Sequence, residues 1–412
     1  MFSYLDQSLY CEQAPLADIA RSAGTPCYVY SSGTILENYR AYDEGLGDLP
    51  HAVCYAVKAN GALAILALLA KAGAGFDIVS GGELYTVLKA GGNAGRVVFS
   101  GVGKTSEEID FALAKGIHGF NCESEPELAL IDALAARRSV RAAFSLRVNP
   151  DVNAETHPYI STGLREHKFG IDIHEAEAIY GRARAFKNLE ARGVSCHIGS
   201  QLLDVGPIFE AMDKVLALVE RLRAAGHAIT HLDLGGGLGV SYREGERPPE
   251  IRAFMDCVRA RLAGKGLTVM VEPGRSIVGP AGVLLTRVLY RKRNVSKEFV
   301  VVDAAMNDLI RPSLYRSHHD ILPVRKTDRP EMVADVVGPV CETGDFLARD
   351  RTLTQVAPGD LLAVMTAGAY GSVLASNYNG RRRPAQVLVE RDKWRIIRTR
   401  ENYEDLVRGE SE

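Results

Sequence analysis

The sequence lacks the cysteine spacing that indicates a disulfide framework or a structural metal site. Its seven cysteines are odd in number, scattered along 412 residues, and never form a Cys-x-x-Cys pair. Structural zinc sites and redox pairs use closely spaced cysteines, and disulfide-stabilised folds use an even set. The cysteines therefore favour a reducing compartment, and no structural metal is expected.

Long apolar runs and an excess of one charge are also missing. The richest apolar stretch, 62–70, is too short for a transmembrane helix, which needs about 18 residues. The first residues include Asp6 and carry no basic segment before an apolar one, so no signal peptide is predicted. A net charge of -2 favours neither nucleic acid nor an anionic membrane as partner. A cytoplasmic protein is expected.

Short apolar strands alternate with helix-period segments between about residues 34 and 275. Strands are predicted at 53–57, 75–79, 97–100, 119–122, 142–148, 193–198, 231–234 and 268–271, with helices such as 62–71, 82–90, 106–115, 125–136 and 208–225 between them. Repeated βα units imply a parallel sheet, and eight of them can close into a barrel. The sequence therefore predicts an α/β fold with a (β/α)8 TIM barrel over 33–275.

The pattern changes after residue 275. β-prone runs at 283–290, 299–302, 332–337, 361–364 and 385–389 are separated by turn signals, with few helical segments between them. This predicts a second, mostly antiparallel β domain over 276–412. The N-terminal segment 1–32 contains a β-prone run at 26–30 and is expected to pack with that domain.

Candidate catalytic residues follow the predicted strands, at the end where barrels of this kind hold their active sites. Lys58 ends the first strand. A lysine that enters a barrel mouth loses hydration, which lowers its pKa and frees the amine for a Schiff base. His197 follows the sixth strand, with Ser200 close behind, and a flat imidazole there suits stacking on a cofactor. Taken singly, such a lysine more often caps the barrel, and a lone histidine is more often structural.

The seventh and eighth strands end in segments suited to an anion. The residues concerned are Gly235, Gly236 and Gly237 after the seventh strand, and Glu272, Gly274 and Arg275 after the eighth. Consecutive glycines let backbone N–H groups approach an anion, and the loops after these strands commonly bind phosphate. Arg275 offers bidentate contacts, and the Glu272 carboxylate could keep a pyridine nitrogen protonated. A tight turn and a Glu272–Arg275 salt bridge are the alternatives.

Together, these strand ends describe a site for the aldehyde, ring and phosphate of pyridoxal phosphate. Further motifs extend along the whole chain, at 55–60, 157–163, 168–171, 197–201, 235–237, 272–275, 311–315, 341–345 and 368–371. They resemble those of the alanine-racemase-like, fold-type III pyridoxal-phosphate-dependent decarboxylases, and within them the group that acts on meso-2,6-diaminopimelate. The resemblance implies decarboxylation of that substrate at its D-centre, giving L-lysine and CO₂ in the last step of lysine biosynthesis.

The resemblance also implies roles for individual residues. Lys58 carries the cofactor, His197 stacks on its ring, and Glu272 faces its pyridine nitrogen. The phosphate is bound or surrounded by Ser200, Gly237, Gly274, Arg275 and Tyr370, with Gly235 and Gly236 also among the cofactor-binding residues and Tyr370 also among those that bind substrate. The loop 151–168 resembles the mobile cover of the family, without individual roles for its residues.

Sites in this family are completed across a dimer interface, so the resemblance implies a homodimer. Cys341 and Glu342 would enter the neighbouring subunit's pocket, where Cys341 would donate a proton to the product. The alternative for Cys341 is a buried apolar thiol, which is the commoner role of a single cysteine. Arg311 and Tyr315, four residues apart, can bind the distal carboxylate of the substrate if their segment is helical, with help from Arg275. Glu342 would bind the distal ammonium. Interface packing with a surface ion pair is the alternative for Arg311 and Tyr315.

Other activities of the same scaffold stay open at this point. Decarboxylases of ornithine, arginine or free lysine act on substrates with no distal carboxylate for Arg311 and Tyr315. A decarboxylase of a carrier-protein-bound amino acid is a further alternative. A racemase would need a second base opposite Lys58, where the partner loop presents Cys341 and Glu342 instead. A non-enzymatic pyridoxal-phosphate carrier would consist of the barrel alone and would lack the residues beyond 275.

Overall fold

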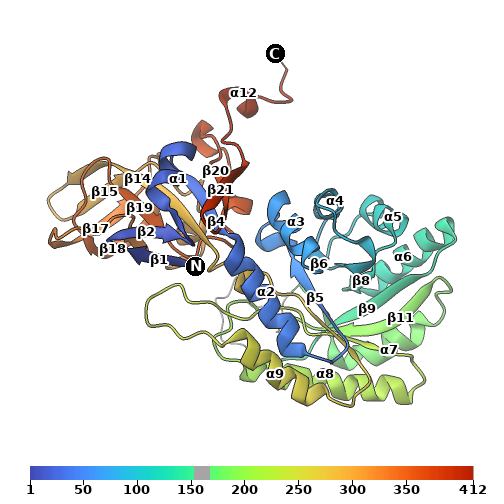
Figure 1. Ribbon diagram of the computed structural model, residues 1–412. Coiled ribbons are helices and arrows are strands. Elements are labelled where there is room, and N and C mark those ends of the chain that lie inside the picture. The colour runs from blue at the N-terminus through green and yellow to red at the C-terminus, as the bar shows by residue number, and fades with distance from the viewer. Residues whose placement is uncertain (153–167, 412) are drawn as a thin grey trace. The chain divides into compact units, whose positions relative to one another are not determined.

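The computed structural model describes residues 1–152 and 168–411. The chain divides into two compact units (Figure 1). The barrel unit comprises Asn38–Val240 and Pro248–Ser276, and the β unit comprises Met1–Glu37, Ser241–Arg247 and Ile277–Glu412.

The barrel unit is built on eight parallel strands that close into a ring. In order they are β5 (His51–Ala56), β6 (Gly75–Ile78), β7 (Val97–Phe99), β8 (Gly119–Cys122), β9 (Ala142–Asn149), β11 (Leu189–Ser195), β12 (His231–Asp233) and β13 (Thr268–Val271), and β13 pairs back with β5. A further strand, β10 (Ile171–Asp172), pairs with β9. The predicted (β/α)8 barrel and all eight of its strands are confirmed.

Helices alternate with these strands along the chain (Figure 1). They are α2 (Ser32–Leu46), α3 (Leu63–Lys71), α4 (Gly81–Lys89), α5 (Ser106–Lys115), α6 (Glu125–Arg138), α7 (Ile173–Ala183), α8 (Gly206–Ala224) and α9 (Ile251–Leu262). The short 3₁₀ helices η1 (Val57–Ala59) and η2 (Ala94–Arg96) lie beside β5 and β7. Side-chain caps fix several starts: the Thr105 hydroxyl accepts a hydrogen bond from the Glu108 N–H, and the Glu108 carboxylate accepts one from the Thr105 N–H. Strands β6, β7 and β8 are buried throughout, which explains their continuous apolar sequence.

The β unit contains a mixed sheet in which most pairings are antiparallel, as predicted. Its strands are β4 (Cys27–Ser31), β14 (Gly282–Arg293), β15 (Glu298–Val302), β16 (Ile321–Pro323), β17 (Glu331–Val337), β18 (Phe346–Thr354), β19 (Leu361–Val364), β20 (Ala385–Glu390) and β21 (Lys393–Arg398). β4, which corresponds to the predicted run at 26–30, lies between β14 and β20. A small sheet of β1 (Phe2–Leu5), β2 (Ser8–Cys11) and β3 (Ala14–Pro15) precedes helix α1 (Leu16–Ala23).

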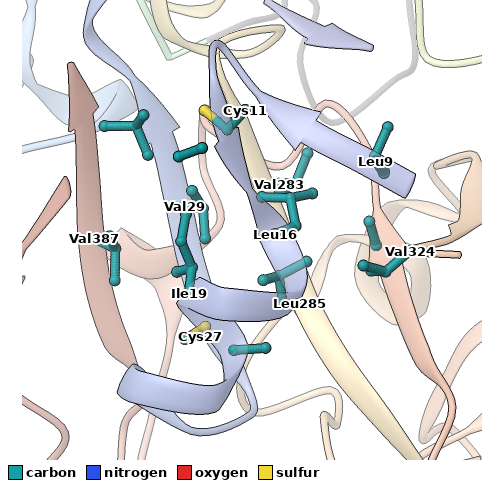
Figure 2. Packing of buried hydrophobic residues seen from close by; sticks show 14 of the residues in the cluster. Leu9, Cys11, Leu16, Ile19, Cys27, Val29, Val283, Leu285, Val324 and Val387 are labelled. Atoms are coloured by element: carbon teal, nitrogen blue, oxygen red, sulfur yellow. The ribbon is translucent and has the colours of Figure 1, made fainter. Parts of the chain in front are cut away.

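One hydrophobic cluster joins the N-terminal segment to this sheet (Figure 2). Alternate residues of β4 and β14 point into it, which is the period of a strand with one face buried. The members labelled in Figure 2 are Leu9, Cys11, Leu16, Ile19, Cys27, Val29, Val283, Leu285, Val324 and Val387. The cluster shows why the first residues fold with the β unit although they lie far from it in sequence.

Several elements of the β unit were not predicted from the sequence. They are β1 to β3, β16, β18, β21 and the short helices α11 (Arg311–Tyr315), η3 (Ser372–Leu374), η4 (Tyr378–Gly380) and α12 (Tyr403–Leu406). The short helix α10 (Arg275–Val278), which begins at the end of the barrel unit, was not predicted either. β18 and β21 carry several charged residues on exposed positions, which obscures a strand pattern. Among the helices of residues 1–152 and 168–411, none has the length and apolar content needed to span a bilayer.

Candidate functional site

The carboxyl ends of the barrel strands carry a concentrated group of polar side chains. They are Lys58 after β5, Asp77 on β6, Ser100 after β7, Asn121 on β8, Arg147 on β9, His197 after β11, Asp233 on β12, and Glu272 after β13. Because the strands are parallel, these positions share one end of the barrel. The sequence predicted three of them, Lys58, His197 and Glu272.

Lys58 lies in η1 and forms an ion pair with Asp77. The Lys58 side chain is 39% exposed, whereas that of Asp77 is 0% exposed. The second carboxylate oxygen of Asp77, Oδ1, is buried and has no hydrogen-bond partner among the described residues. The lysine was expected to be desolvated at the barrel mouth, but it is paired with a carboxylate instead.

Glu272 lies within a network of hydrogen bonds from neighbouring strands. Its Oε1 accepts from Asn121 Nδ2 at 3.0 Å and from the Ser100 hydroxyl at 3.3 Å. The same Asn121 nitrogen donates to Asp233 Oδ2 at 2.9 Å. Burial raises the pKa of Glu272 well above its usual value, and the charges of Asp233 and Asp77 raise this pKa further. This placement differs from the alternative in which Glu272 pairs with Arg275.

His197 is held by the glycine loop that follows β12. The Gly236 N–H donates to Nδ1 of His197 at 3.3 Å, so the ring proton is assigned to Nε2. Burial lowers the pKa of His197 to about 3, and the charges of Arg147 and Lys58 act in the same direction. The ring is therefore neutral near pH 7 and suited to stacking on a flat aromatic group.

The three glycines are required by close backbone packing. Gly235 and Gly237 have φ angles of 63° and 119°. A Cβ atom at Gly236 would lie 2.3 Å from the Glu272 carbonyl oxygen, and one at Gly237 would lie 2.4 Å from that of Gly199. The Gly235 N–H donates to Asp233 Oδ1 at 2.9 Å. The loop is thus a tight turn, and it also draws the ends of β11, β12 and β13 together.

Arg275 begins α10, directly after this group. Its guanidinium is buried, and Nη2 donates to the Ser200 hydroxyl at 3.0 Å. A Cβ atom at Gly274 would lie 2.9 Å from that of Ala59, so the loop after β13 packs closely on the segment that carries Lys58. The arrangement places a cation and a hydroxyl together, which is suited to a phosphate.

Two further predicted residues, Arg311 and Tyr315, lie at the two ends of α11 in the β unit. Arg311 is 5% exposed, which excludes the surface ion pair considered for it. Its Nη1 donates to the Tyr242 hydroxyl at 2.6 Å and its Nη2 to the Ser317 hydroxyl at 3.2 Å. The segment is helical, as the spacing of Arg311 and Tyr315 required.

The predicted residues Cys341, Glu342 and Tyr370 also belong to the β unit. Cys341 is exposed, so the buried apolar thiol considered for it is wrong. Its N–H donates to Asn379 Oδ1 at 2.9 Å, and Glu342 is exposed as well. Tyr370 has a φ of 54°, an uncommon conformation for a residue other than glycine. Most of the predicted cover 151–168, including the motif at 157–163, lies outside the described residues.

The acidic and amide side chains inside the barrel were not predicted from the sequence. Asp77, Asn121 and Asp233 are buried polar residues within short apolar strands, a signal that was present in the sequence. Arg147 was also missed; it forms a buried ion pair with Glu123, with Nη1 2.9 Å from Oε1. Only the closure of the barrel brings these residues to one end.

The residues of the barrel unit fit pyridoxal phosphate. Lys58 supplies an amine for its aldehyde, His197 a neutral ring, Glu272 a carboxyl group for its pyridine nitrogen, and Arg275 a cation for its phosphate. Two buried polar atoms, Asp77 Oδ1 and Arg147 Nε, have no partner among the described residues, as expected where a polar molecule binds.

Known proteins resemble the chain over its whole length. The family model for the pyridoxal-binding domain of pyridoxal-dependent decarboxylases matches residues 32–279. Diaminopimelate decarboxylase of Pseudomonas aeruginosa is 55% identical over 410 residues, covering 100% of this chain and 98% of the relative. The crystal structure of diaminopimelate decarboxylase from Helicobacter pylori with L-lysine matches with a TM-score of 0.92 and 44% identity, covering 95% of this chain and 98% of that one.

A more distant solved structure gives the same result. Diaminopimelate decarboxylase from M. jannaschii, also in complex with L-lysine, matches with a TM-score of 0.94 and 37% identity, covering 100% of this chain and 98% of that one. Identity at this level over nearly complete chains goes beyond a shared fold. The chain belongs to the diaminopimelate decarboxylases, within the pyridoxal-dependent decarboxylase family.

Proposed function

We propose that this protein removes CO₂ from the D-centre of meso-2,6-diaminopimelate to give L-lysine, with pyridoxal phosphate as its cofactor. The observation that carries the proposal is the group of Lys58, His197, Glu272 and Arg275 at one end of the barrel. The resemblance to diaminopimelate decarboxylases over the whole chain supports the substrate. When bound, the cofactor supplies an electron sink for the pair that the departing carboxylate leaves.

The barrel residues have complementary tasks in this proposal. Lys58 holds the aldehyde carbon, and its ion pair with Asp77 positions the amine. His197 would stack on the ring, and its neutral imidazole would place no charge there. Glu272 holds a proton at the pyridine nitrogen. The phosphate is bound by Ser200 and Arg275 and surrounded by Gly235, Gly236, Gly237 and Gly274, with Tyr370 from the β unit.

The β unit supplies recognition of the substrate's far end. Arg311 and Tyr315 bind the distal carboxylate, with help from Arg275, and Glu342 binds the distal ammonium. The buried position of Arg311 supports this role, because a guanidinium removed from water is stabilised by an anion. Ornithine, arginine and lysine offer no such anion. An amino acid on a carrier protein is also disfavoured, because a buried cation suits a small free dicarboxylate.

The reaction also needs a proton for the carbon that has lost CO₂. We assign its donation to Cys341, whose thiol lies on an exposed segment. In this proposal, Cys341 and Glu342 act in the site of a second copy of the chain, so that a homodimer is the active form. The exposure of both residues supports this, since a residue that serves a partner must lie at the surface of its own chain.

The proposal includes the domain boundaries of the chain and its location in the cell. We place the cofactor-binding barrel at 33–275 and the β domain at 276–412, with 1–32 packing on the latter; the match of the pyridoxal-binding family model to 32–279 supports the first. A cytoplasmic location is supported by seven cysteines that are all free, since thiols persist in a reducing compartment.

An assay of the purified protein with pyridoxal phosphate tests this function. Separate reactions with meso-diaminopimelate, L-lysine, L-ornithine and L-arginine are followed by CO₂ release and by separation of the amine products. The expected result is L-lysine and CO₂ from meso-diaminopimelate, with turnover of the other three substrates lower by orders of magnitude. Preferential turnover of lysine, ornithine or arginine would overturn the proposal.

A further inference from the structure

Asp233 is a buried acidic residue to which the proposed function gives no role. It is the last residue of β12 and is 1% exposed. Its Oδ1 accepts the Gly235 N–H at 2.9 Å, and its Oδ2 accepts Nδ2 of Asn121 at 2.9 Å. The same Asn121 Nδ2 lies 3.0 Å from Glu272 Oε1, so the two carboxyl groups are close neighbours. Asp233 is therefore fixed by backbone and side chain directly beside the residue that faces the cofactor nitrogen.

Asn121 ties the two carboxyl groups together. Its Nδ2 lies 2.9 Å from Asp233 Oδ2, 3.0 Å from Glu272 Oε1 and 3.2 Å from the Ser100 hydroxyl. An amide nitrogen has only two hydrogens, so these contacts compete. Two ionised carboxylates have no proton with which to hydrogen-bond each other, and so close a pair in a buried site cannot ionise fully. The two carboxyl groups that contact Asn121 Nδ2 therefore hold one proton between them.

The other charged groups near the pair do not supply this proton. Asp77 lies on β6 and adds negative charge, and Lys58 is engaged with Asp77. The thiol of Cys54 on β5 is buried and neutral, because its pKa is raised well above its usual value by burial and by the three acids Asp233, Glu272 and Asp77. The pair consequently carries one proton and one negative charge near neutral pH.

We propose that Asp233 is a positioning residue that shares this proton with Glu272 and thereby keeps the pyridine nitrogen of the cofactor protonated. This rests on the proposed function. With the cofactor bound, Glu272 would give the shared proton to the ring nitrogen: the O–H bond would break and the N–H bond would form. Both carboxyl groups would become carboxylates, and the positive charge of the protonated ring would compensate the added negative charge. The total charge is unchanged, so no proton is taken from solvent. The negative charge of Asp233 then makes Glu272 a stronger acceptor for the N–H of the ring.

The Asp233→Asn substitution tests this role. Asparagine has nearly the size of aspartate, can still accept the Gly235 N–H through its oxygen, and can donate its own N–H to Glu272. What disappears is the shared proton, the negative charge behind Glu272 and the hydrogen bond from Asn121, since two amide nitrogens cannot donate to each other. The ring nitrogen should then lose its proton at a pH about one unit lower, a tenfold change in its proton affinity. Asp308→Asn serves as the matched control, because Asp308 is a buried acid of the β unit.

The test is the ¹⁵N chemical shift of ¹⁵N-labelled pyridoxal phosphate bound to the full chain, followed from about pH 6 to about pH 9. Wild type and Asp308→Asn should stay protonated over more of this range than Asp233→Asn, and Glu272→Gln should be unprotonated throughout. An Asp233→Asn titration that coincides with wild type would overturn the inference, while leaving the proposed function intact. Failure of wild type to bind the cofactor would overturn both.

Infrared spectra of the wild-type protein test the inference without relying on the variant's stability. Loading the cofactor should bleach a carbonyl band of a protonated carboxyl group, because the shared proton leaves Glu272. The band should be absent from the difference spectrum of Glu272→Gln. A wild-type difference spectrum without such a band would contradict the proton transfer.

Discussion

The guanidinium of Arg311 lies over the ring of Tyr242, with its central carbon 4.6 Å from the ring centroid, and donates to the Tyr242 hydroxyl at 2.6 Å. Tyr242 comes from Ser241–Arg247, a segment between two stretches of the barrel unit that itself belongs to the β unit. Its ring also meets that of His319 edge-on, at a centroid distance of 5.1 Å. Tyr242, which was not predicted from the sequence, thus holds in place Arg311, the residue proposed to bind the distal carboxylate of the substrate.

Removing the Tyr242 hydroxyl should weaken recognition of meso-diaminopimelate. Tyr242→Phe keeps the ring under Arg311 but deletes the hydrogen bond to a charged donor, which is worth about 1.5 kcal/mol, or roughly tenfold in kcat/KM. Most of the loss should appear in KM, because the residue acts through substrate binding. Steady-state kinetics of Tyr242→Phe and wild type provide the measurement. A fall in kcat alone would assign Tyr242 a different task.

Lys58 should be the residue that carries the cofactor. Borohydride reduction of the loaded protein, followed by digestion and mass spectrometry, should place the reduced cofactor on the peptide containing Lys58. Lys104→Arg is the matched control, because Lys104 is another lysine of the barrel unit paired with an acid, Glu127. It should be labelled like wild type, whereas Lys58→Ala should not be labelled. Label on any other lysine of the wild-type protein would refute the assignment.

The arrangement of Lys58 and Cys341 in different units leads to a prediction about assembly. If the two act in one site from different copies of the chain, Lys58→Ala and Cys341→Ala should each be inactive. Mixing them should restore activity, because each hybrid dimer has one intact site. Random exchange gives half hybrids with one site in two intact, or about a quarter of wild-type activity. No recovery, with hybrids demonstrated by mass, would exclude shared sites.

The neutral ring of His197 predicts a loss of stability in acid. Its pKa of about 3 in the folded chain lies below the ordinary value of 6.5, so protons bind the unfolded chain more readily. The stability that the neutral ring contributes to the folded chain is fully present above pH 6.5. It is lost progressively as the pH falls toward 3. For this partly exposed ring, the loss between pH 7 and pH 5 should be on the order of 1 kcal/mol.

Chemical unfolding of the cofactor-free protein at pH 7 and pH 5 measures this effect. His197→Gln removes the titrating group, so its free energy of unfolding should fall less over this interval than that of wild type. The other titratable groups are the same in both proteins, so their effects cancel when the two losses of unfolding free energy are compared. Equal losses in both would show that His197 is not held neutral.

The barrel could be predicted because its strands are short apolar runs separated by segments with helical periodicity. The strands β18 and β21 could not, since their charged residues lie on exposed faces and hide the alternation. Lys58, His197 and Glu272 were found because they follow strands immediately. Asp77, Asn121 and Asp233 lie on different strands, and their hydrogen bonds connect positions far apart in sequence, as between Asn121 and Glu272. Only barrel closure reveals that they belong together.

Arg311→Ala tests most directly whether the protein selects a substrate with a distal carboxylate. Removing one partner of a buried charge pair costs roughly 2–5 kcal/mol, or about 30-fold to several thousand-fold in kcat/KM. The measurement is kcat/KM for meso-diaminopimelate in wild type and variant, beside the affinity of both for a small amine without a distal carboxylate. The account predicts that kcat/KM falls by this amount while the affinity for the amine stays nearly unchanged. A parallel fall in both would contradict it, because Arg311 would then support the fold or the cofactor rather than the substrate.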